Sequence, residues 1–86
     1  MAYINGNNSS ELLEGQLFNT NRIFGNGGDD DIYGGRYADT IYGGSGWDLI
    51  YGDSGNDKIY GNDGADEIYG EGGNDTIYGG AGIDRL

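Results

Sequence analysis

Residues 25–86 are one nine-residue motif written seven times, GNGGDDDIY, GGRYADTIY, GGSGWDLIY, GDSGNDKIY, GNDGADEIY, GEGGNDTIY and GGAGIDRL, the last copy one residue short. Glycine opens every copy, aspartate holds the sixth place, and isoleucine or leucine holds the eighth. Tyrosine ends all six full copies. A fixed period without insertions is the signature of one small structural unit stacked on itself. The motif therefore predicts a linear repeat protein.

Each copy divides into a turn and a short strand. Its first six residues are rich in glycine, asparagine, aspartate and serine, which favour turns, and its last three combine an aliphatic with an aromatic residue, which favours a strand. Strands this short fit a coil in which two strands and two turns, eighteen residues, make one revolution. Parallel crossovers are almost always right-handed. We therefore predict an all-β fold, a right-handed parallel β-roll (a β-solenoid) with two short parallel sheets.

The eighth place of each copy is expected to form the core. Side chains alternate faces along a strand, so an inward eighth residue leaves the seventh and ninth pointing outward. The seventh place holds unrelated residues, as a solvent position should, and the tyrosines of the ninth place are expected to stack as ladders on the two outer faces. One sheet should be lined by Ile32, Ile50, Ile68 and Leu86, and the other by Ile41, Ile59 and Ile77.

Residues 1–24 fit the same register as weakened copies. GNNSSELLE, residues 6–14, has Glu11 in the acidic place and Leu13 in the apolar place. Residues 15–24 make a copy with one residue too many, in which Asn21 and Ile23 take those places. Because repeat arrays commonly need capping units, we interpret residues 1–24 as an N-terminal cap and residues 25–86 as the β-roll of a single domain. The alternative is a disordered leader.

Composition limits both the stability and the function of the chain. Of its 86 residues 35% are hydrophobic, and 15 acidic side chains against 4 basic ones give a net charge of −11. This balance is typical of a chain that stays unfolded on its own. It argues against nucleic acid as a partner, and no apolar run is long enough for membrane insertion. With no cysteine, no histidine and no evident nucleophile–base pair, we do not expect an enzyme.

The sixth-place aspartates are the candidate metal ligands. Turns eighteen residues apart would stack about 4.8 Å apart, and carboxylates repeated at that spacing repel one another unless cations lie between them. Turn capping by aspartate explains an acidic turn but not a whole stacked column. Carboxylates and turn carbonyls are hard oxygen donors in an adaptable cage, which suits Ca²⁺. One edge should carry Asp30, Asp48, Asp66 and Asp84, and the other Asp39, Asp57 and Asp75.

These residues give five same-edge pairs, so about five Ca²⁺ ions would nearly balance the net charge of −11. Two turn positions depart from the common pattern. Tyr37 replaces the glycine of the fourth place, where a positive φ is expected, and Glu71 takes the second place, where Glu tolerates a left-handed backbone less well than Asn or Asp does.

The copies resemble the GGxGxDxUx nonapeptide of repeats-in-toxin (RTX) proteins, whose β-roll binds Ca²⁺. GGSGWDLIY at residues 43–51 and GEGGNDTIY at residues 70–78 are close matches. The resemblance implies that each ion lies between two same-edge turns and is bound by both sixth-place aspartates and by turn carbonyls. It implies the carbonyls of the following residues: Gly25, Gly27, Gly34, Arg36, Gly43, Gly44, Ser45, Gly46, Gly52, Asp53, Ser54, Gly55, Gly61, Asn62, Asp63, Gly64, Glu71, Gly73, Gly80 and Gly82.

The same resemblance implies a secreted bacterial protein that folds in calcium-rich surroundings outside the cell. The amino terminus has no basic region followed by an apolar stretch, so we expect no N-terminal signal peptide. The family's C-terminal secretion signal is missing and Leu86 ends within an expected strand. Either the chain belongs to a longer protein, or this strand associates end to end with a second copy. An alternative function is a scaffold whose outer faces bind glycan, ice, mineral or a partner protein.

Overall fold

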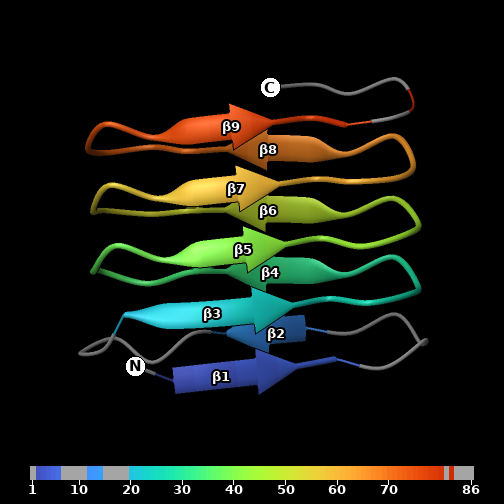
Figure 1. Ribbon diagram of the computed structural model, residues 1–86, viewed down its shortest axis with the longest axis horizontal. Coiled ribbons are helices and arrows are strands. Elements are labelled where there is room, and N and C mark those ends of the chain that lie inside the picture. The colour runs from blue at the N-terminus through green and yellow to red at the C-terminus, as the bar shows by residue number, and fades with distance from the viewer. Residues whose placement is uncertain (1, 7–11, 15–19, 81, 83–86) are drawn as a thin grey trace.

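A computed structural model describes residues 2–6, 12–14, 20–80 and 82. All the regular secondary structure of this part of the chain is β-strand. The described residues contain no helix that is long and apolar enough to cross a membrane. The strands are β1 (Ala2–Asn5), β2 (Leu12–Glu14), β3 (Asn21–Phe24), β4 (Asp31–Tyr33), β5 (Thr40–Tyr42), β6 (Leu49–Tyr51), β7 (Lys58–Tyr60), β8 (Glu67–Tyr69) and β9 (Thr76–Tyr78). They form flattened coils stacked on one another, with the turns gathered at two opposite edges (Figure 1).

The strands belong to two parallel sheets. The odd sheet has the order β1-β3-β5-β7-β9 and the even sheet the order β2-β4-β6-β8. From β3 onward each residue pairs with the residue eighteen positions later, as in Ile41 with Ile59 and Ile50 with Ile68. The predicted β-solenoid with two short parallel sheets and an eighteen-residue coil is confirmed.

The two sheets continue into residues 1–24. There Ile4 pairs with Ile23 and Leu13 with Ile32, offsets of nineteen residues instead of eighteen. The longer offset follows from the additional residue in the copy at residues 15–24, which both pairings must span. Residues 2–5 and 12–14 therefore have the register of weakened copies, and the capping role of residues 1–24 stays a prediction. Glu11, Asp84 and Leu86 lie outside the described residues.

The core is a single stack of eighth-place side chains between the two sheets. The isoleucines from Ile23 to Ile68 are at most 1% exposed, and the flanking residues of the same strands are more exposed. Ile4 and Ile77 pack against this stack from its two ends. The inward eighth place is thus confirmed for the described residues, and the core is only one side chain wide.

Aromatic ladders cover part of both outer faces. Successive rings lie 5.0–5.2 Å apart with interplanar angles of 3–13°, so Tyr42, Tyr51 and Tyr60, which have a ring on either side, present mainly their edges and hydroxyl groups. The predicted tyrosine ladders are confirmed, and the faces between stacked rings are closed to a sugar ring. The ladders consist of Phe24, Tyr42, Tyr60 and Tyr78 on the odd sheet and Tyr33, Tyr51 and Tyr69 on the even sheet.

Candidate metal centre

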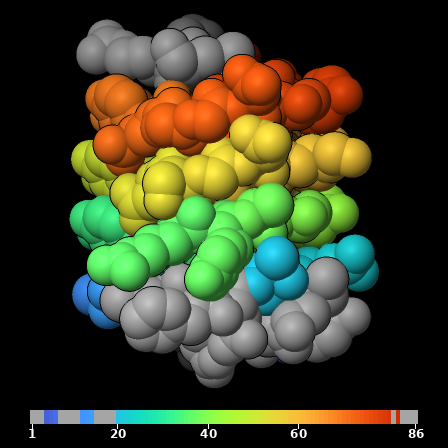
Figure 2. All heavy atoms as spheres, turned by 90° about the vertical axis from the view of Figure 1, so that its left-hand side faces the viewer, coloured from blue at the N-terminus to red at the C-terminus, as the bar shows by residue number. Residues whose placement is uncertain are grey.

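The sixth-place side chains, nearly all aspartates, are stacked along the two edges where the chain passes from one sheet to the other. The odd edge, which leads into the odd-numbered strands, carries Asn21, Asp39, Asp57 and Asp75, and the even edge carries Asp30, Asp48 and Asp66. Figure 2 faces the odd edge and shows its coils in direct contact from one layer to the next. The structure therefore places same-edge aspartates together and keeps the two edges apart.

These aspartates are buried. Asp30, Asp39, Asp48, Asp57 and Asp66 are at most 2% exposed, as deeply enclosed as the isoleucines of the core. Burying an ionised carboxylate is strongly unfavourable unless it is hydrogen-bonded and paired with positive charge. Turn aspartates that served only as solvated caps would not need this enclosure. Their burial indicates a binding role for the column.

In each described aspartate pair, one carboxylate oxygen of the later residue ties the two neighbouring coils together. The backbone N–H of Asp39 donates to Oδ1 of Asp57 at 2.8 Å, and that of Asp57 donates to Oδ1 of Asp75 at 2.8 Å. The even edge repeats this contact from Asp30 to Asp48 and from Asp48 to Asp66, both at 2.9 Å. Each predicted same-edge pair among the described residues is therefore in direct contact.

The second carboxylate oxygen has no such donor. Oδ2 of Asp39, Asp48 and Asp57 is buried and accepts no hydrogen bond, and Oδ2 of Asp30 and Asp66 is buried in the same way. A buried anionic oxygen without a donor or a counter-ion carries the full cost of its lost hydration. The gaps are therefore suited to a cation.

The first-place glycines bring a carbonyl oxygen close to each of these Oδ2 atoms. A Cβ atom on Gly43 would lie 2.8 Å from Asp48 Oδ2 and 2.9 Å from the Gly61 carbonyl oxygen. Gly34 has the same relation to Asp39 Oδ2, at 2.8 Å, and to the Gly52 carbonyl, at 2.9 Å. Because these two glycines lack a positive φ, close approach rather than backbone conformation requires glycine here. Two kinds of acceptor thus converge at each gap.

Burial changes the acidity of the column. Desolvation raises the pKa of Asp57 to about 8 and that of Asp48 to about 7, and neighbouring aspartates add to both shifts while a backbone N–H opposes them. Desolvation also raises the pKa of Asp39, to about 6, against two opposing hydrogen bonds from Asn21. Without a cation Asp57 is largely protonated at neutral pH, Asp48 is partly protonated, and Asp39 takes up its proton at about pH 6. Such competition between proton and metal is expected of buried carboxylate ligands.

The donor set fits calcium. Within the described part of the chain no three acidic side chains gather at one point, so each gap offers two carboxylates together with main-chain carbonyls. An all-oxygen set of this kind, assembled from a flexible glycine-rich turn, matches Ca²⁺ better than Mg²⁺, which demands a tight octahedron and keeps its water. The carbonyls named from the resemblance lie in these turns at the two edges, and which of them bind an ion stays a prediction.

The turn backbone follows the period with one exception. Every described second-place residue has a positive φ, including Asn26, Asp53, Asn62 and Glu71, and so does every described fourth-place glycine. Tyr37, in a fourth place, does not. Asp39 nevertheless keeps the contact with Asp57 that its counterparts make. The departure at Tyr37 therefore changes the turn locally without breaking the register of the column.

The sequence analysis did not predict a second set of hydrogen bonds between coils, which is made by fifth-place residues. The N–H of Trp47 donates to Asp29 Oδ1, and that of Asn74 donates to Asn56 Oδ1, both at 2.8 Å. Asp29 is an exposed turn residue that also links two coils. The sequence signal for these contacts is an Asp or Asn in the fifth place of a copy, where its side chain can accept the backbone N–H of the fifth-place residue eighteen positions later.

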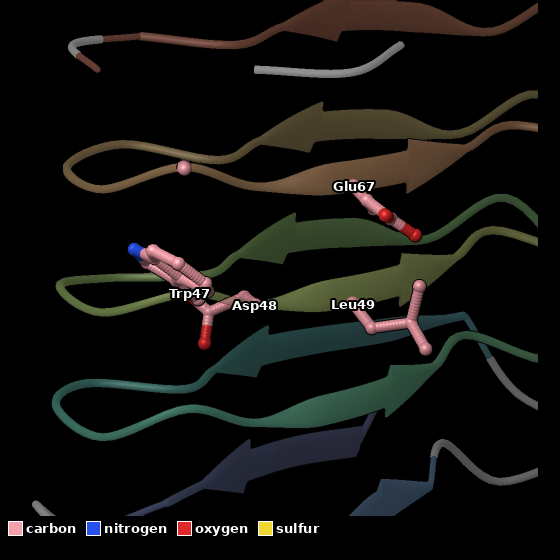
Figure 3. A pocket seen from close by; sticks show the side chains of 5 residues that line it. Trp47, Asp48, Leu49 and Glu67 are labelled. Carbon is pink, nitrogen blue, oxygen red and sulfur yellow. The ribbon is translucent and has the colours of Figure 1, made fainter. Parts of the chain in front are cut away.

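Trp47 lies beside the candidate metal centre but outside it. It is 69% exposed, as expected for a turn residue. Together with Leu49 and Glu67 it lines a surface pocket of about 140 Å³ on the outside of the even sheet (Figure 3). Since Trp47 directly precedes buried Asp48 and is hydrogen-bonded to the coil below, its fluorescence should report the order of this edge.

Stacked coils with buried, inward-facing carboxylates on both edges define an all-β solenoid of the metal-binding type. The family model for the RTX calcium-binding nonapeptide repeat (4 copies) matches the chain over residues 24–59 and again over residues 51–86. A comparison with curated proteins gave no match. The family match spans well over half of the sequence, and the chain belongs to the RTX calcium-binding nonapeptide repeat family.

Proposed function

We propose that this chain is a calcium-binding module that folds when Ca²⁺ fills the gaps between same-edge aspartates. The observation that carries the proposal is the set of buried Oδ2 atoms without hydrogen-bond donors, each close to a turn carbonyl. The five gaps are Asp30–Asp48, Asp48–Asp66 and Asp66–Asp84 on the even edge, and Asp39–Asp57 and Asp57–Asp75 on the odd edge.

Bound calcium would supply the positive charge that the fold lacks. The core is one isoleucine wide and the net charge is −11, so the metal-free chain has little apolar burial to set against self-repulsion. Each ion would also connect two coils, which makes the sites cooperative in the manner of other linear repeats. Because the site exists only in the folded chain, binding free energy becomes folding free energy.

We further propose that the module works outside the cell. Isolated sites of this kind are expected to bind in the range of roughly 10⁻⁴–10⁻³ M, which suits extracellular calcium and leaves the chain metal-free in the cytosol. Membership in the RTX repeat family supports secretion of the unfolded chain, and nothing in the proposal requires catalysis by this module.

The test is a calcium titration of the metal-free protein followed by far-ultraviolet circular dichroism and by Trp47 fluorescence. We expect a disordered spectrum in chelator, a cooperative transition to β structure with Ca²⁺, and a much weaker response to the same concentration of Mg²⁺. Isothermal titration calorimetry should give about five ions per chain. A full β spectrum in chelator that calcium leaves unchanged would contradict calcium-driven folding.

A further inference from the structure

The lowest gap on the odd edge is built differently from those above it. Asn21 takes the sixth-place position there and faces Asp39, whereas every gap above it on this edge lies between two aspartates. Asn21 is 2% exposed, so it is enclosed as completely as the aspartates. The sequence alone marks this position as a ligand lost from a weakened copy.

The side-chain amide nitrogen of Asn21 makes hydrogen bonds at the position where Oδ2 of an aspartate makes none. Its Nδ2 donates to Asp39 Oδ1 at 2.9 Å and to the Gly34 carbonyl oxygen at 3.0 Å. Its backbone N–H donates to the same Asp39 Oδ1 at 2.8 Å, which is the contact seen at every described gap. Because both partners of the amide are acceptors, the atom that faces them must be the nitrogen.

The next gap upward makes the comparison direct. There Asp39 replaces Asn21, Gly52 replaces Gly34 and Asp57 replaces Asp39, each eighteen residues later. The backbone contact is unchanged, at 2.8 Å. Asp39 Oδ2 now stands in the place of Nδ2, accepts no hydrogen bond and lies near the Gly52 carbonyl. In this gap two acceptors, the Asp39 carboxylate and the Gly52 carbonyl, face each other. In the gap below, the Asn21 NH₂ donor faces the Gly34 carbonyl.

We propose that Asn21 takes the place of a calcium ion, so that the Asn21–Asp39 gap is closed by a neutral amide and binds no metal. This inference rests on the proposed calcium binding of the gaps above. The NH₂ group supplies the positive end of a dipole toward the two acceptors that an ion would otherwise bridge. It also leaves one carboxylate in the gap instead of two, which lowers the repulsion there.

An amide-closed gap gives the odd edge a base that needs no calcium. The coil of β3 can then lie against the coil of β5 without an ion between them, and the lowest ion on this edge lies between Asp39 and Asp57. The number of ions held by the odd edge is therefore set by the position of the asparagine, and restoring an acid there should add a site.

The experiment is the Asn21→Asp variant, with calcium stoichiometry measured by calorimetry and by equilibrium dialysis at saturating calcium. We expect one additional ion per chain, because a second carboxylate now faces Asp39 across the gap. The matched control is Asn56→Asp, on the same edge and with the same change of charge. Asn56 is exposed, and an aspartate there can still accept the N–H of Asn74. It should add no ion.

An Asn21→Asp chain that binds the same number of ions as the natural chain would overturn the inference. Should that variant not fold, the natural chain provides the second measurement. In its calcium-loaded state the side-chain NH₂ of Asn21 should exchange slowly with solvent in ¹⁵N NMR spectra; fast exchange would mean that the oxygen has turned toward an ion. If the natural chain binds no calcium at all, the proposed function itself fails, which is a distinct result.

Discussion

The strands and the turns of this molecule bury their side chains equally well, but only the buried side chains of the strands have all their interactions satisfied within the chain. The isoleucines from Ile23 to Ile68 and the sixth-place aspartates from Asp30 to Asp66 are all at most 2% exposed, and both sets repeat every eighteen residues along each edge or sheet. Stacked isoleucines satisfy one another by contact. Stacked aspartates present Oδ2 atoms that accept no hydrogen bond, beside turn carbonyls that are acceptors as well. Under the proposed calcium binding, the condition for folding would therefore reside in the turns.

The largest effect should come from Asp57→Ala, because Asp57 belongs to two candidate gaps, with Asp39 below and Asp75 above. If each site has the expected weak affinity, losing two sites at about 10 mM Ca²⁺ should cost about 3–5 kcal/mol of folding free energy. We expect the calcium midpoint of the circular dichroism transition to rise several-fold and the stoichiometry to fall by about two ions.

Asp63→Ala is the matched control for Asp57→Ala. Asp63 is an exposed aspartate of a neighbouring turn, outside the sixth-place column, and its substitution removes the same charge. Only a small shift of the midpoint is expected from it. Equal effects of the two variants would refute the assignment of the sixth place as the metal-binding column.

The pH response should separate the turns from the strands without any substitution. Burial raises the pKa of Asp39, Asp48 and Asp57 to about 6, 7 and 8, above the value of about 3.9 in an unfolded chain. Between these limits the metal-free folded state binds more protons than the unfolded state. The stability that these protons contribute to the folded state is therefore fully present below about pH 4. It is lost as the pH rises through the pKa values of the folded state.

Calcium-free protein is accordingly expected to gain β structure on acidification from about pH 8 to about pH 5, while the calcium midpoint rises because protons compete for the same oxygens. Circular dichroism at several pH values, with and without saturating calcium, measures both trends. A metal-free spectrum that stays the same over this interval would show that the carboxylates do not limit folding.

Much of this division between strands and turns could be predicted from the sequence. Every full copy has nine residues, so the pairing of Ile41 with Ile59 follows from counting, and one additional residue before Phe24 predicts the shifted pairing of Ile4 with Ile23. The aspartate column follows from the same count. Periodicity is informative here because no insertion interrupts it.

The individual contacts of the turns could not be predicted in this way. The sequence shows an asparagine at position 21 but not that its amide nitrogen faces Gly34 and Asp39, since this depends on the path of the turn backbone. It places Asp29 and Trp47 in equivalent fifth places but does not show that Asp29 accepts the N–H of Trp47. Side-chain hydrogen bonds depend on atomic positions that hydrophobic period and turn propensity do not determine.

A smaller effect is expected on the strand side of the comparison. Ile50 is 0% exposed and lies in the middle of the stack, so Ile50→Val should lower the stability of the calcium-loaded protein by about 0.5–1.5 kcal/mol through the lost methyl group. The number of bound ions should not change. Ile77→Val, nearer the end of the stack and only partly buried, is the control and should cost less. A lower ion count for Ile50→Val would mean that core and sites are not separable.

The smallest effect concerns the turn backbone apart from its ions. Glu71 has a φ of 65°, in the left-handed region that costs an L-residue roughly 1–2 kcal/mol and glycine almost nothing. Glycine also loses more entropy on folding, by roughly 0.5–1 kcal/mol, so Glu71→Gly should stabilise the calcium-loaded protein by about 0–1.5 kcal/mol in thermal unfolding. Glu71→Gln removes the charge and keeps the strain. Asn62→Gly, at a φ of 68°, relieves little because asparagine tolerates this region. If Glu71→Gly is no more stable than Glu71→Gln, strain at this turn is negligible and the aspartate gaps alone limit the stability of the turns.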